Sequence, residues 1–197
     1  MAIHHSKAKD IQSFIIYNLA GHEKNIGRLV SEQFNVSRVT ATKYLKRLID
    51  EGLIEVEGKT KDRVYKLKII VNKNVTLPVT PQLDEDIVWN REVRPLLSDL
   101  KENVLGICAH GITEMLNNVI SHSESPTVGI FVMRNAAIVR MYVVDQGVGI
   151  FSKIQQRFNL ADPQHALLEL AKGKLTTDEK HHAGEGIFFT SRMFDKF

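Results

Sequence analysis

Residues 111–123, GITEMLNNVISHS, decide how the C-terminal part of this chain is organised. When the stretch is treated as a helix, its side chains separate onto two faces. The apolar face uses the spacing i, i+3, i+4, i+7 and i+8 and carries Ile112, Met115, Leu116, Val119 and Ile120. The second face repeats every four residues and carries an acid, an amide and an imidazole, which are Glu114, Asn118 and His122. A solvated face normally mixes Lys and Glu, so this short-armed row indicates a functional face.

A glycine motif follows this helix about twenty residues later in the chain. The apolar run 138–144 is typical of a strand, and it ends in DQGVGI, residues 145–150. The members of the motif that we assign to a site are Asp145, Gly147, Gly149 and Ile150. A carboxylate at the end of an apolar strand is expected to face a cleft, although a plain hairpin turn would look the same in sequence.

A second glycine motif, GEGI, opens a helical pattern over residues 187–197. Its site members are Gly184, Gly186 and Ile187. Free N–H groups at such a helix start are suited to phosphate oxygens. The polar stretch 172–183 before it has no buried face and contains Thr176 and Thr177, so we interpret it as a lid over a site.

Taken in order, the three segments resemble the ATP-binding domain of the Bergerat-fold superfamily, which includes gyrase, heat-shock chaperone, histidine kinase and mismatch-repair ATPases. The resemblance covers residues 84–197 and implies an α/β two-layer sandwich with a mixed sheet that binds Mg-ATP. The short lid, the Thr pair and the E-x-x-x-N spacing are most similar to serine-kinase-type anti-sigma factors. Sheets of that family continue past the last helix, so we expect the domain to be truncated at its C-terminus.

The resemblance also implies a role for each matched residue. Asn118 would bind Mg²⁺, which takes few protein ligands and accepts neutral oxygen donors. Glu114 would be the general base, and Asp145 would accept a hydrogen bond from the adenine amino group. The remaining nucleotide-binding positions are His122, Gly147, Gly149, Ile150, Thr176, Thr177, Gly184, Gly186 and Ile187. The alternative for Glu114 and Asn118 is an ordinary surface acid and amide.

The N-terminal part of the chain predicts three helices followed by a β-hairpin. The helices are expected over residues 11–19, 25–34 and 38–49, with Ser37 as the cap of the third and Gly52 as its stop. Val39, Ala41, Leu45 and Leu48 are expected to pack inward. The stretch VSRVTATKYLKRLIDEGLI, followed by the hairpin 53–67, resembles a winged helix-turn-helix domain.

That resemblance implies binding of double-stranded DNA by the third helix and the hairpin tip. The residues that we assign to DNA are Ser37, Arg38, Thr40, Lys43, Arg47, Lys59, Lys61 and Arg63. Residues 1–70 hold 13 Lys and Arg against 8 Asp and Glu, whereas residues 71–197 hold 13 against 15, so the basic charge lies in this first part. The alternative is a winged helix used only for protein contacts or dimerisation.

Composition sets the remaining limits. The chain has 197 residues, 43% of them hydrophobic and 25% charged, which is typical of a soluble globular protein. The single cysteine, Cys108, excludes an intramolecular disulfide, and no apolar run is long enough to span a membrane, so we expect a cytoplasmic protein. We therefore predict an α+β architecture with a winged helix-turn-helix over residues 1–70, a linker or extended segment over 71–83 and an ATP-binding domain over 84–197.

The function expected from this organisation is ATP-binding transcriptional regulation, in which Mg-ATP binding is coupled to binding of DNA or of a protein partner. One alternative is an anti-sigma-type protein serine/threonine kinase that acts on a regulatory partner. Another is an interaction scaffold that binds no nucleotide. The sequence leaves open whether the chain is an ATPase or kinase and whether it forms a homodimer.

Overall fold

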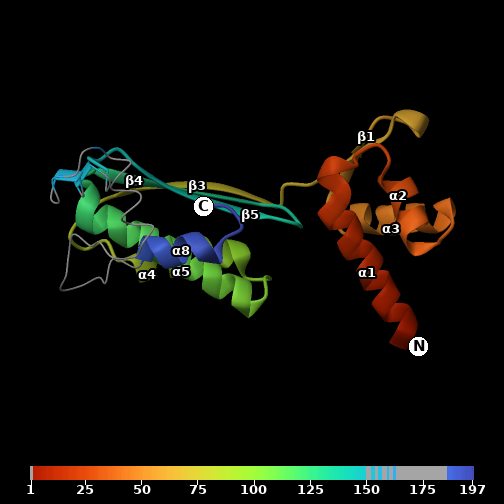
Figure 1. Ribbon diagram of the computed structural model, residues 1–197, viewed down its shortest axis with the longest axis horizontal. Helices are drawn as coiled ribbons and strands as arrows, with labels where there is room; N and C mark the ends of the chain where they lie inside the picture. The colour runs from red at the N-terminus through yellow and green to blue at the C-terminus, as the bar shows by residue number, and fades with distance from the viewer. Residues whose placement is uncertain (1, 150–151, 154, 157–158, 160–161, 163–185) are drawn as a thin grey trace. The chain divides into compact units, whose positions relative to one another are not determined.

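A computed structural model of the chain describes residues 2–149, 152–153, 155–156, 159, 162 and 186–197 (Figure 1). Over these residues the protein is a mixed α+β structure with six α-helices and two small antiparallel sheets. They divide into two compact units. The first unit comprises Met1–Lys73 and Val132–Arg140, and the second comprises Asn74–Phe131 and Met141–Phe197. No helix in this part of the chain is long and apolar enough to cross a membrane.

The first unit contains three helices and a hairpin. Its elements are α1 (Ala2–Asn18), the 3-10 turn η1 (Leu19–Gly21), α2 (Ile26–Phe34), α3 (Arg38–Asp50), β1 (Ile54–Glu57), the 3-10 turn η2 (Thr60–Asp62) and β2 (Val64–Leu67). Buried residues recur at three- or four-residue spacing along the helices. Together with Leu19 of η1 and Ile54 of β1 they form a core of Ile11, Ile15, Leu19, Ile26, Val30, Ala41, Leu45, Leu48 and Ile54. The helix predicted over residues 11–19 begins at Ala2, because the polar residues before Ile11 continue the helix without contributing to the apolar pattern.

Helix α3 begins at the predicted residue, Arg38, and ends at Asp50, one residue later than predicted. The Ser37 hydroxyl oxygen accepts a hydrogen bond from the Thr40 backbone N–H at 3.1 Å, which satisfies one of the free donors at the helix start. Gly52 follows the helix with a φ of +72°, a conformation that favours glycine.

The inward position predicted for Val39 is wrong, because its side chain is 67% exposed. Ala41, Leu45 and Leu48 are buried as expected. A residue two positions before Ala41 lies about 200° away from it around the helix axis. Val39 therefore points to the side of α3 opposite the core.

The hairpin β1–β2 is antiparallel, and its register pairs Ile54 with Leu67 and Glu57 with Val64. Ile54 is buried in the core of the first unit, and the three β1 residues after it are exposed. The turn Thr60–Asp62 (η2) lies at the distal end of the hairpin.

The three-stranded sheet has the order β3–β4–β5, with β3 (Val71–Pro78), β4 (Thr127–Arg134) and β5 (Val139–Asp145). The segment predicted as a linker or an extended stretch is thus an edge strand over most of its length. Alternate residues of β4 are buried, including Val128 and Ile130, whereas Phe131 is 40% exposed. This alternation places one face of the sheet against the helices of the second unit.

The helices of the second unit are α4 (Glu85–Val88), the π-helical turn η3 (Trp89–Val93), the 3-10 turn η4 (Arg94–Leu97), α5 (Glu102–Asn118), the π-helical turn η5 (Val119–Ser123) and α8 (Gly186–Met193). Figure 1 shows α5 and α8 side by side on one side of the sheet. Val88 and Trp89 are buried, whereas Ile87 and Arg91 are exposed. The π-helical turn that begins at Trp89 changes which residues face inward.

Helix α5 forms the centre of the second unit. Leu105, Cys108, Ile112 and Leu116 are buried along one side of it, with the three- and four-residue spacing that an apolar helix face requires. Burial raises the pKa of the Cys108 thiol, because the thiolate loses its hydration in this core. The predicted strand 138–144 is β5, displaced by one residue, and the predicted helix 187–197 is the shorter α8.

Candidate functional site

The glycine motif after β5 forms a tight turn that its own aspartate closes. Asp145 is the last residue of β5 and is half-buried. Its Oδ1 atom accepts a hydrogen bond from the Gly147 backbone N–H at 2.8 Å. This Asx-type turn holds the carboxylate in a fixed direction at the end of the strand.

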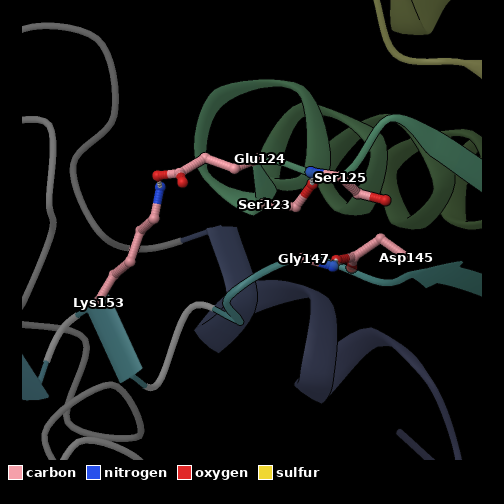
Figure 2. A network of polar contacts seen from close by, with 6 residues as sticks. All are labelled: Ser123, Glu124, Ser125, Asp145, Gly147 and Lys153. Carbon is pink, nitrogen blue, oxygen red and sulfur yellow. Dashed lines mark hydrogen bonds and ion pairs between the residues drawn. The ribbon is translucent and has the colours of Figure 1, made fainter.

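The turn is bound to the end of the α5–η5 helix by two backbone donors, and Figure 2 shows its Asp145 and Gly147 beside Ser123 and Ser125. The Gln146 N–H donates to the Ser125 hydroxyl oxygen at 3.1 Å, and the Val148 N–H donates to the Ser123 carbonyl oxygen at 2.9 Å. A Cβ atom at Gly147 would overlap the Ser123 backbone carbonyl. Glycine is therefore required at this position by the close approach of two backbones.

Ser123 and Ser125 hold this turn in place and were not singled out from the sequence. Both are buried, and the Ser123 hydroxyl oxygen accepts a hydrogen bond from the Ser125 N–H at 3.0 Å. The Ser125 hydroxyl in turn donates to the Thr127 carbonyl oxygen at 2.6 Å. The sequence does contain a Ser-x-Ser pattern directly after a helix, and serine hydroxyls in such a place can bond to backbone groups of a turn. It does not indicate that the bonded backbone group belongs to Gln146.

Glu124 lies between the two serines and points away from them (Figure 2). Its φ of +61° is left-handed, and this conformation ends the π-helical turn. Its carboxylate forms an ion pair with the Lys153 ammonium group at 2.6 Å. Because the Glu124 side chain is 68% exposed, this pair contributes little to the stability of the fold.

The polar row of α5 is present in the structure, and Glu114, Asn118 and His122 are all half-buried. Glu114 and Asn118 lie one turn apart in regular α-helix, whereas His122 lies in the π-helical turn η5. The wider turn alters the spacing from Asn118 to His122, so the row is regular only over its first two members. π-Helical turns of this kind occur frequently at functional sites.

The side-chain nitrogen of Asn118 is buried and has no hydrogen-bond partner among the described residues. A buried amide donor without a partner is costly, and in native proteins such groups usually have a function or a further partner. The amide at this position would suit a phosphate oxygen through its nitrogen and a hard cation through its oxygen. The residue therefore fits the role of a Mg-nucleotide ligand.

Helix α8 is placed against the Glu114 side of α5. A Cβ atom at Gly186, the first residue of α8, would overlap the Glu114 carboxylate. At the other end, a Cβ atom at Gly111 would overlap the Phe194 ring. Two glycines thus allow close contact between the helices, and the start of α8 lies beside the acid of the polar row.

The structure describes only some of the other residues that were predicted to bind nucleotide. Ile187 follows Gly186 in α8 and is half-buried, and Gly149 has a φ of +80° with open space around it. Ile150, Thr176, Thr177, Gly184 and the predicted lid over residues 172–183 lie outside the described residues. Within the described part of the chain, no group of three or more His, Cys, Asp and Glu side chains could hold a metal ion.

The outward face of α3 is cationic. Its exposed side chains are Arg38, Val39, Thr42, Lys43, Lys46, Arg47 and Asp50, which are four cations against one acid. Of the residues predicted to bind DNA, Arg38 and Lys43 are exposed, while Thr40 is half-buried. The Thr40 and Ser37 hydroxyls lie 2.9 Å apart and hydrogen-bond to each other. Arg47 is exposed near the end of the helix and binds Glu51 at 2.8 Å. Thr42 and Lys46 belong to this face and were not predicted.

The hairpin adds cations at its distal end. Lys59 and Arg63 are exposed on either side of the turn η2, and the side chain of Lys61 lies outside what the structure describes. Lys66 on β2 donates a hydrogen bond to Glu57 at 2.8 Å. That hydrogen bond and the charge of Glu57 raise the pKa of Lys66.

Comparison of the chain with models of protein families, with curated proteins and with solved structures finds no match. A function for this protein must therefore be argued from the arrangement of its own residues.

Proposed function

We propose that this chain is a DNA-binding transcriptional regulator whose second unit binds Mg-ATP. Nucleotide binding is supported by the contacts among three segments that are far apart in sequence. The start of α8 lies against Glu114, and the turn after β5 is hydrogen-bonded to the end of the same helical stretch. Asn118 lies between these two contacts along the chain, with a buried amide nitrogen that has no partner among the described residues.

The chemistry of these groups suits the parts of a nucleotide. The Asp145 carboxylate is oriented by its bond to Gly147 and has acceptor capacity left for an exocyclic amino group. The Asn118 amide can bind a cation or a phosphate oxygen, and backbone N–H groups at the start of α8 favour negative charge. Mg²⁺, when bound, would neutralise part of the phosphate charge. This division of roles is the one that the family resemblance implies.

The DNA part of the proposal is supported by α3 and the hairpin. Four exposed cations lie on the outward face of α3, and two more flank the hairpin turn; these are Arg38, Lys43, Lys46, Arg47, Lys59 and Arg63. A helix with an exposed cation in its first turn and further cations along the same face can enter the major groove, while an adjacent hairpin can contact the phosphate backbone. Three helices followed by such a hairpin make the arrangement expected of a winged helix-turn-helix.

Asp145→Asn is the sharpest test of the nucleotide part. An asparagine keeps an oxygen that can accept the Gly147 N–H, so the turn is preserved, whereas the second acceptor becomes an amide donor. If Asp145 binds the adenine amino group, two donors then face each other at a cost of about 1–3 kcal/mol, and ATP affinity falls about ten- to hundred-fold.

The measurement is calorimetric titration of the full chain with Mg-ATP and with Mg-GTP. The matched control is Glu124→Gln, which changes an exposed carboxylate nearby and is expected to leave ATP affinity unchanged. Equal affinity of the wild-type chain and Asp145→Asn for ATP would refute adenine recognition. Failure of the wild-type chain to bind any nucleotide would refute the whole nucleotide part and favour an interaction scaffold.

The alternative that the geometry supports is a protein serine/threonine kinase. Glu114 is half-buried beside the start of α8, where a carboxylate could accept the proton of an attacking hydroxyl. A kinase transfers the γ-phosphoryl group of radiolabelled ATP to a protein, whereas a nucleotide switch changes the affinity for duplex DNA when ATP is added. Measuring both in the same preparation separates the two functions.

A further inference from the structure

Val39 is an apolar side chain in an otherwise polar and cationic surface. It is the second residue of α3 and is 67% exposed. Thr42 and Lys43, three and four residues later, are its neighbours on the same helix face, and both are exposed. A single exposed apolar residue is common on proteins. Val39, however, lies in the first turn of α3, the helix that we propose to enter the major groove, where an exposed side chain can reach the bases.

We propose that Val39 contacts the 5-methyl group of a thymine, so that the chain selects DNA sites with thymine at one defined position. This inference rests on the proposed DNA binding and names the base that the helix recognises. In the major groove, thymine alone among the four bases presents a methyl group, and apolar side chains are suited to it. Valine in a helix is held close to one rotamer, so its two methyl groups are already oriented.

The hydrogen bonding of Thr40 supports this assignment. The sequence assigns Thr40 to DNA binding, but it is half-buried and its hydroxyl is hydrogen-bonded to that of Ser37 at 2.9 Å. The Thr40 hydroxyl is therefore part of the hydrogen bonding at the N-terminus of α3. Val39 occupies the outward position beside it, and its side chain has no part in the core of the first unit.

The experiment begins with selection of binding sites by the full chain from a random pool of DNA duplexes. In the selected duplex, each thymine is then replaced singly by deoxyuridine, which removes one methyl group and leaves all hydrogen-bonding groups in place. We expect one position at which this replacement weakens binding by the wild-type chain about four-fold, the loss that corresponds to one buried methyl group.

Val39→Ala is expected to bind the thymine and deoxyuridine duplexes equally at that position. Val39→Thr retains one methyl group and is expected to keep part of the preference. The matched control is Lys46→Ala on the same face, which is expected to weaken binding to both duplexes alike and to keep their ratio. Since the Val39 side chain is mostly exposed, neither substitution is expected to disturb folding.

The outcomes separate the two proposals. If Val39→Ala keeps the wild-type ratio, or if no thymine position responds to methyl removal, the contact proposed for Val39 is wrong while DNA binding stands. If the wild-type chain enriches no sequence and does not bind duplex DNA, the proposed DNA binding itself is wrong.

Discussion

Gly147→Ala tests the central contact of the candidate site, because the residue is fixed by the approach of another backbone. An added Cβ would overlap the Ser123 carbonyl carbon and oxygen, and neither atom can rotate away as the end of a side chain could. If the turn stays in place, the overlap costs about 1–3 kcal/mol. If it moves away, the hydrogen bonds from Gln146 and Val148 are lost at about 1 kcal/mol each. In both cases the free energy of unfolding falls by about 2 kcal/mol.

The assay is urea unfolding followed by the fluorescence of Trp89, the only tryptophan, which is 7% exposed in the second unit. With an m value of about 2 kcal/mol per molar, a loss of about 2 kcal/mol lowers the midpoint by about 1 M. Gly106→Ala is the matched control, since Gly106 is exposed in α5 and a Cβ there meets nothing within 4 Å. It is expected to raise the midpoint, because alanine is favoured over glycine in a helix by about 1 kcal/mol.

Gly149→Ala separates the two reasons for which a glycine can be needed. Gly149 has open space around it but a φ of +80°, so alanine there has only the backbone cost of about 1–2 kcal/mol. Gly147 has no such φ, and its cost comes from the overlap alone. An unchanged midpoint for Gly147→Ala, or a rise like that of Gly106→Ala, would refute the backbone contact between residues 147 and 123.

The remaining predictions concern the polar row and the buried thiol of α5. Asn118→Ala is expected to weaken binding of Mg-ATP more than binding of metal-free ATP, as measured by calorimetry with and without EDTA. Glu114→Ala is expected to keep ATP affinity and to lower any turnover about 10²–10⁴-fold, as measured by phosphate release or transfer; equal loss of binding in both variants would contradict the separate roles. Because the pKa of Cys108 is raised in the folded chain, the unfolded chain loses the thiol proton first, and stability should fall as pH rises from the ordinary thiol pKa of about 8.5 towards the folded value. Cys108→Ala should show a smaller fall in urea midpoint between neutral and alkaline pH, and identical falls in both proteins would exclude the thiol as the cause.

Local features of the fold could be predicted because they depend on few neighbouring residues. The Ser37 cap, the Gly52 stop and the hairpin after α3 follow from side-chain chemistry and turn preferences at those positions. The apolar side of α5 follows from spacing alone, since a four-residue step from Ile112 to Leu116 and a three-residue step to Val119 keep the side chains on one side only in a helix. The candidate pair Glu114 and Asn118 came from that same spacing.

Features that depend on contacts between distant segments could not be predicted. The sequence gives no reason for the bonds from the β5 turn to Ser123 and Ser125, because the partners are more than twenty residues apart and become neighbours only after the strands form. The π-helical turns at Trp89 and Val119 could not be predicted from the sequence either, because the apolar pattern continues through them. The turn at Val119 accounts for the irregular spacing of His122.

Three glycines of the candidate site are required for three different physical reasons. A substitution at each of them therefore tests something different about nucleotide binding. Gly147 is needed because of the Ser123 backbone, and Gly149 because of its left-handed φ, so the fold alone explains both residues. Gly186 is different, because the atom that an added Cβ would meet is the end of the flexible Glu114 side chain, which can rotate away. Loss of nucleotide binding on changing Gly147 would therefore reflect a damaged turn, whereas the same loss on changing Gly186 would report on the space beside Glu114 itself.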